Sequence, residues 1–239
     1  MTAPAMHMLN LSELVLWYLA FLAAIVTHEA AHAWAAFKLG DPTARDGGQV
    51  TLDPFPHIRR EPVGTLVVPI VSFLLGGWMI GWASTPYDRA WALRYPRRAA
   101  LMALAGPSAN LLMVLAAALL IRLGLAFEVF AAPTSIGFAS LVAAPHGGVW
   151  EGLAMLLSIF FSLNLLLLLF NLLPVPPLDG SAIVLLLLSQ RLALSYRKLL
   201  ESPAASMLGL LLAWKFIGAI FRPLMLLAIN LLYPGVGYH

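Results

Sequence analysis

Three residues with the chemistry of a metal-dependent hydrolase lie close together in the first part of the chain. His28, Glu29 and His32 are read in the sequence as HEAAH. On an α-helix, residues four positions apart share a face, so both imidazoles can bind one Zn²⁺ ion while Glu29 stays near a water molecule as general base. The alternative is a pair of core histidines bonded to neighbouring carbonyl groups. The pattern favours a catalytic zinc site.

The stretch around this motif is long enough to cross a lipid bilayer. Residues 11–39 are largely apolar, and a spanning helix needs about 20 such residues. Each charged residue at membrane depth costs roughly 2.5–3.5 kcal/mol on insertion scales. A function for the three ionisable groups is therefore the default expectation.

Composition independently predicts a polytopic membrane protein. The chain is 61% hydrophobic and 10% charged, against about 25% charged in soluble domains. Stretches without Asp, Glu, Lys or Arg cover residues 63–82, 99–121, 152–178 and 180–190. We expect an all-α fold of about five to six membrane segments. It forms one domain over residues 1–239, with its core motifs in 27–180 and C-terminal membrane helices in 181–239.

A third zinc ligand must come from another part of the chain, because catalytic zinc takes three protein donors. Asp179 is the best candidate, since no other carboxylate lies between Glu151 and Glu201. The prolines of the preceding segment NLLPVPPLDG break a helix and force an extended passage, which can aim Asp179 inward. The alternative is that Asp179 only caps a helix beginning at Ser181.

Basic residues predict the orientation in the membrane. They form two groups, one before and one after residues 63–82: Lys38, Arg45, Arg59 and Arg60, then Arg89, Arg94, Arg97 and Arg98. The positive-inside rule locates both groups in the cytoplasm and the N-terminus outside. Residues 63–82 must then enter the membrane and return without crossing, as a broken, re-entrant segment. The same path delivers Asp179 to the cytoplasmic half, at the depth of the two histidines.

The remaining candidates have structural interpretations. His57 is expected in a surface loop, with contact to substrate or transient metal ligation as the alternative. Residues 47–65 are expected to form a loop with at most a small hairpin. Asn110 is expected to hydrogen-bond across helices. The chain has no Cys, which excludes thiolate zinc sites, and its net charge of +3 comes mostly from loops, which argues against nucleic-acid binding.

Three motifs together resemble the site-2 protease family of intramembrane zinc metalloproteases. They are HEAAH on a membrane helix, GPSAN at residues 106–110, and the run from Asn171 through Pro174 and Pro177 to LDG. They follow the family's order and span residues 27–180, about two thirds of the chain.

The resemblance implies one Zn²⁺ bound by His28, His32 and Asp179, with Glu29 as catalytic base. It also implies that Asn171 helps to position the substrate carbonyl or its oxyanion. Family members often carry an inserted PDZ domain or appended CBS domains. The segments outside the motifs are too short for either, so we expect a minimal form.

The expected reaction is hydrolysis of a peptide bond in or near a transmembrane segment of a membrane-protein substrate. The lipid bilayer is the environment, and we expect the plasma membrane with the site facing the cytoplasm. A zinc-binding scaffold or transporter without proteolysis would use the same histidines. Retention of Glu29 disfavours an inactive scaffold, and uncharged membrane segments disfavour a transporter. A hydrolase with a Glu ligand in an aqueous domain is disfavoured because no such domain is predicted, and the sequence carries no signal for an oligomeric state.

Overall fold

The long helices of the computed structural model confirm the prediction of an all-α membrane protein. The structure describes residues 11–188, 192–193, 196, 200 and 202–239. Within them, four helices are long and apolar enough to cross a membrane: α1 (Leu11–Lys38), α6 (Pro96–Ala126), α7 (Val149–Asn171) and α10 (Pro203–Leu232). A shorter apolar helical stretch covers Val63–Gly76. These described residues contain no named strand, only two isolated bridges.

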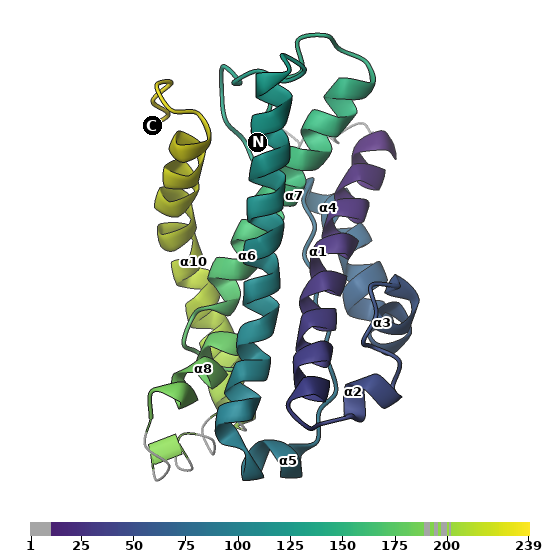
Figure 1. Cartoon of the computed structure of the whole chain (residues 1–239), viewed down its shortest axis with the longest axis vertical. Coiled ribbons are helices and arrows are strands. Elements are labelled where there is room, and N and C mark those ends of the chain that lie inside the picture. The colour runs from purple at the N-terminus through teal and green to yellow at the C-terminus, as the bar shows by residue number, and fades with distance from the viewer. Residues whose placement is uncertain (1–10, 189–191, 194–195, 197–199, 201) are drawn as a thin grey trace, which may run out of the picture.

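The core lies where α1, α6 and α7 pack against one another, with α10 against α7 (Figure 1). One cluster of buried side chains joins α1 to α7 and includes Trp17, Phe21 and Ile159. Another joins α6, α7 and α10 and includes Ile121, Phe161 and Ile229. The helices are apolar around most of their circumference, which suits helices that face both a core and lipid.

The predicted set of membrane helices in 181–239 lies partly outside the described residues. In its described part, up to residue 188, the apolar run after Asp179 forms the short helix α8 (Asp179–Ile183) and one 3₁₀ turn, Val184–Leu186. Neither can span a bilayer, which needs about 20 helical residues. The described part of this region contains one helix long enough to span a membrane, α10. Residues 189–191, 194–195, 197–199 and 201 lie outside the described ranges.

Residues 47–53 form an irregular turn, as predicted, but residues 54–60 and 63–65 are helical, so the prediction of a loop with at most a small hairpin was wrong for the second part of 47–65. The segment follows the short helix α2 (Thr43–Asp46) and contains α3 (Pro54–Arg60). Asp53 caps α3 by accepting a hydrogen bond from the backbone N–H of Phe55. Pro54 stands at the first helical position, where no backbone donor is needed. Asp53 and Pro54 together therefore start a helix.

Residues 63–82 fold back, so that the two ends of the segment lie side by side. A π-helical turn, η1 (Val63–Val67), leads into α4 (Val68–Gly76), which ends at Gly77 in the left-handed conformation with φ 73°. The chain then returns without helix, and Trp82 N–H donates to Gly64 O over 3.1 Å. A Cβ on Gly64 would lie 2.3 Å from Trp82 O, so this close approach requires glycine. The geometry agrees with a re-entrant path.

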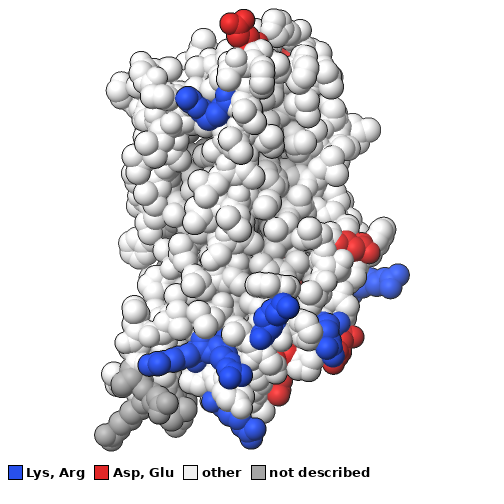
Figure 2. All heavy atoms as spheres, in the orientation of Figure 1, with Lys and Arg blue, Asp and Glu red and all other residues white. Residues whose placement is uncertain are grey.

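The two ends of the molecule differ in charge. The C-terminal end of α1 lies at the same end as α2, α3, α5 (Arg89–Arg94) and α8, whereas the chain's C-terminus lies at the opposite end (Figure 1). Figure 2 shows Lys and Arg gathered mainly at the first end, and a middle band of this face without charged residues. This asymmetry is the pattern that the positive-inside rule associates with the cytoplasmic side.

The fold-back predicts the accessibility of three exposed positions. In this cysteine-free chain, single Arg60→Cys and Arg94→Cys variants should react with a membrane-impermeant maleimide only from the cytoplasmic side. A Thr134→Cys variant, in the loop between α6 and α7, should react only from the other side. Labelling in right-side-out and inverted vesicles measures this. If Arg94→Cys reacts only from the side opposite to Arg60→Cys, residues 63–82 cross the membrane completely.

Candidate metal centre

Helix α1 carries three buried ionisable side chains within the helix bundle. His28, Glu29 and His32 are each at most 6% exposed. The helical repeat brings the two imidazoles together, with 3.0 Å between their Nε2 atoms. The possible ligand atoms of all three residues lie within 4.8 Å of one another. A buried group of this kind needs polar partners, and a metal ion is one that satisfies several donors at once.

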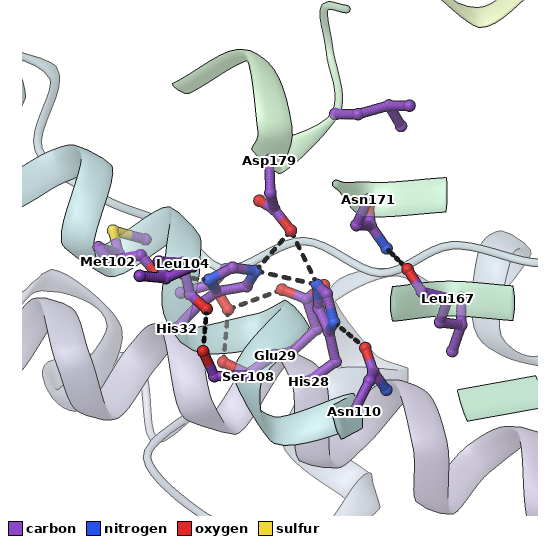
Figure 3. A network of polar contacts seen from close by, with 12 residues as sticks. His28, Glu29, His32, Met102, Leu104, Ser108, Asn110, Leu167, Asn171 and Asp179 are labelled. Carbon is purple, nitrogen blue, oxygen red and sulfur yellow. Dashed lines mark hydrogen bonds and ion pairs between the residues drawn. The ribbon is translucent and has the colours of Figure 1, made fainter. Parts of the chain in front are cut away.

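Asp179 joins the two histidines from a distant part of the chain. After α7 ends at Asn171, the proline-rich turn leads into α8, and the Asp179 carboxylate points back at α1 (Figure 3). Its Oδ2 lies 3.1 Å from His28 Nε2 and 3.3 Å from His32 Nε2. The capping alternative was wrong, because α8 begins at Asp179 itself and has no side-chain capping bond.

The three donor atoms fit a zinc ion. Their separations are 3.0, 3.1 and 3.3 Å, and donors on a tetrahedron with bonds of about 2.0–2.1 Å stand about 3.3 Å apart. Two imidazoles and one carboxylate form a donor set typical of catalytic zinc, which takes water or substrate in its fourth position. The Asp179 side chain is 20% exposed, against 7% for each histidine, so the site is least enclosed on the Asp179 side.

The second nitrogen of each imidazole is held by helix α6. His32 Nδ1 lies 2.8 Å from the carbonyl oxygen of Met102, which can only accept, so Nδ1 carries the proton and Nε2 is free to bind a metal. His28 Nδ1 contacts Asn110 Oδ1. This contact confirms that Asn110 hydrogen-bonds across helices.

Thr85 was not predicted as a site residue, although it touches the expected general base. It lies in the non-helical segment that follows the fold-back of residues 63–82. Its hydroxyl is 2.8 Å from Glu29 Oε2 and 2.9 Å from the Glu29 carbonyl oxygen. Thr85 is 56 residues from Glu29 in sequence. No local pattern connects the two, so only the tertiary fold could reveal this contact.

The close packing of Gly106 against α1 explains why the GPSAN motif begins with glycine. A Cβ at this position would lie 2.3 Å from His32 Nε2 and 2.5 Å from His28 Nε2. These are the atoms that face the metal position. The missing side chain therefore lets α6 pack directly against the two imidazoles.

Of two other candidate site residues, Asn171 keeps its predicted role as a prediction and His57 lies elsewhere than expected. Asn171, at the end of α7, donates from Nδ2 to Leu167 O of its own helix over 3.0 Å (Figure 3). Its role toward substrate stays a prediction. His57 is only 1% exposed, and its Nε2 lies 3.1 Å from Thr51 O. The expectation of a surface-loop histidine was wrong, because α3 turns this side chain inward.

The contacts of Gly106 predict a strong effect of one methyl group. Gly106→Ala should weaken zinc binding at least about 10-fold, the lower range for changes beside metal ligands. The helix itself should not suffer, because alanine is a better helix former than glycine. Metal affinity measured by chelator competition tests this. The matched control is Gly218→Ala in α10, where nothing lies within 4 Å of an added Cβ; equal zinc affinity in both variants would contradict the assigned packing.

Comparisons with known proteins identify a family for this chain. The model of peptidase family M50 matches residues 16–213. The "Putative zinc metalloprotease YwhC" of Bacillus subtilis is 38% identical over 159 residues, which cover 66% of this chain and 62% of that protein. The correspondingly named Rip2 of Mycobacterium tuberculosis is 34% identical over 162 residues, covering 68% of this chain and 53% of Rip2.

The Rip2 of Mycolicibacterium smegmatis is 30% identical over 160 residues, or 67% of this chain and 52% of that protein. The chain thus spans roughly half to three fifths of the length of these relatives. No solved structure matches it. Because the family model covers most of the sequence, the chain belongs to peptidase family M50, the site-2 protease family.

Proposed function

We propose that this chain is an intramembrane zinc metalloprotease, with zinc held by His28, His32 and Asp179. The observation that carries the proposal is the convergence of three donor atoms within 3.3 Å, beside a buried glutamate. Family membership and the zinc metalloprotease names of the relatives support the same chemistry. Its substrate is a membrane protein, cleaved in or near a transmembrane segment.

The chemistry divides between the metal and Glu29. When bound, zinc acts as a Lewis acid that makes water more acidic and polarises a carbonyl group. Glu29 accepts the proton of the attacking water and then donates it to the nitrogen of the leaving amine as the C–N bond breaks. The water oxygen becomes part of the new carboxyl group, so one water is consumed for each peptide bond.

Thr85 orients the Glu29 carboxylate for this transfer. Its hydroxyl bonds Oε2 at 2.8 Å, which leaves Oε1 as the oxygen able to exchange a proton with water. A hydrogen bond to a carboxylate also limits its rotation, and fixed geometry is a large part of general-base efficiency.

Substrate backbone must be unwound before it can react. In an intact α-helix the carbonyl oxygens accept hydrogen bonds from residue i+4, which hides them from the site. Asn171 is our candidate for holding the exposed carbonyl or its oxyanion. A rotation of its side chain would exchange the bond to Leu167 O for one to substrate.

The orientation of the site follows from charge. His32 lies six residues before the end of α1, about 9 Å from the end that carries the basic residues. The positive-inside rule therefore favours a site in the cytoplasmic half of the plasma membrane, where cytoplasmic water reaches the Asp179 side.

Separating metal binding from catalysis gives a direct test. Glu29→Gln should bind about one zinc per chain, as the wild type does, but lose at least about 10²- to 10⁴-fold in cleavage rate, because the base is removed. Cleavage of a panel of single-span proteins in proteoliposomes, with zinc content measured on the same samples, checks both. Near-normal cleavage by Glu29→Gln would disprove the role of this residue. A wild type that binds zinc but cleaves no member of the panel would support the scaffold or transporter alternative.

The assignment of Asp179 as the third zinc ligand can be tested separately. Asp179→Ala should lose both zinc occupancy and activity, because two imidazoles alone are fewer donors than catalytic zinc normally takes. The matched control is Asp46→Ala, an exposed carboxylate paired only with Arg45 among the described residues. If Asp179→Ala holds zinc as firmly as the control does, while His32→Ala does not, then Asp179 is not a ligand.

A further inference from the structure

Two asparagines are completely buried between helices α6 and α7. Asn110 and Asn164 each have 0% exposure. Asn110 Nδ2 donates to Asn164 Oδ1 over 2.8 Å, and Asn164 Nδ2 donates to the backbone carbonyl of Phe160 over 2.8 Å. Through Asn110 Oδ1, this series of contacts ends at His28 Nδ1.

The carbonyl of Phe160 determines the direction of every bond in the series. A carbonyl oxygen can only accept, so the amino group of Asn164 must face it. The oxygen of Asn164 then faces Asn110, whose amino group must donate to it. Asn110 consequently presents its oxygen, an acceptor, to His28 Nδ1. Each amide has one orientation in which all of these contacts are satisfied.

A zinc-bound His28 requires this acceptor. A neutral imidazole that binds metal through Nε2 carries its proton on Nδ1 and needs an acceptor there. The reversed Asn110 amide would present an N–H group to that N–H, leaving two buried donors unsatisfied. The orientation of Asn110 therefore affects how well His28 can bind zinc.

We propose that Asn164 is a positioning residue that acts on the metal site through Asn110, holding the Asn110 amide so that it accepts from His28. The proposal rests on zinc ligation by His28. Asn164 touches neither the histidine nor the position of the metal, and it lies 54 residues from Asn110 in sequence. Helix α7 thus supports the ligand carried by α1 through a residue of α6.

The first measurement needs no variant. In zinc-loaded protein with ¹⁵N-labelled histidine, His28 should show an Nδ1-bound proton that exchanges slowly with water, because a buried acceptor holds it. The His28→Gln variant assigns the signal. Absence of a slowly exchanging His28 Nδ1 proton in wild-type protein overturns the proposal.

The second measurement removes the support. Asn164→Leu, a change of similar shape, should weaken zinc binding about 10-fold and speed exchange of the His28 Nδ1 proton, because Asn110 loses its fixed orientation. The control is Ser162→Ala, which removes another buried hydrogen bond of α7, to Phe138 O. Unchanged zinc affinity and exchange rate in folded Asn164→Leu contradict the proposal.

A double-mutant cycle separates orientation from a general loss of structure. In Asn110→Asp both side-chain oxygens accept, so either orientation satisfies His28 Nδ1. In this background Asn164→Leu should leave zinc affinity and proton exchange unchanged. A full 10-fold loss in the double variant would show that Asn164 only stabilises the fold. Neither readout requires cleavage of a substrate, so the role of Asn164 can be tested even if the proposed protease activity is not found.

Discussion

The fold depends on one requirement, that a carboxylate from α8 meets two imidazoles from α1 inside an assembly of apolar helices. The Asp179 Oδ2 lies within 3.3 Å of both Nε2 atoms, although 147 residues separate His32 from Asp179 in the numbering. Charged groups at this depth are costly unless they find partners of opposite charge or a metal. The close contact of α1 with α6 at Gly106, and the proline-rich turn after α7, both serve this approach.

The surroundings of the site supply one partner for almost every polar atom near the metal position. The Met102 carbonyl holds one imidazole, the Asn110 amide holds the other, and the Thr85 hydroxyl holds the Glu29 carboxylate. These partners come from α6 and from the non-helical segment after the fold-back, whereas the two histidines and Glu29 come from α1. In an apolar interior such bonds also fix orientation, because water cannot replace a lost partner.

The sequence predicts the site residues whose positions depend on local periodicity or on a scarce residue type. The i, i+4 spacing in HEAAH brings the histidines together on any helix, and Asp179 was identifiable as an isolated carboxylate after a helix break. Thr85 and Asn164 were missed because their partners are distant in sequence and no spacing rule links them. His57 was misassigned because neighbouring arginines indicated a surface, while the cap at Asp53 sets a helix that turns this histidine inward.

The contact between Thr85 and Glu29 is evidence for the path of residues 63–82 that does not depend on the distribution of basic residues. If residues 63–82 crossed the membrane as a helix, 20 residues would carry the chain about 30 Å away from the end of α3. Thr85 would then lie near the opposite membrane surface, out of reach of Glu29 in the half of α1 that holds HEAAH. Instead, Arg60 Nε bonds Ser84 O over 3.1 Å, and the adjacent Thr85 bonds Glu29. The fold-back is therefore what positions Thr85 beside Glu29, so the path of residues 63–82 and the surroundings of Glu29 cannot vary separately.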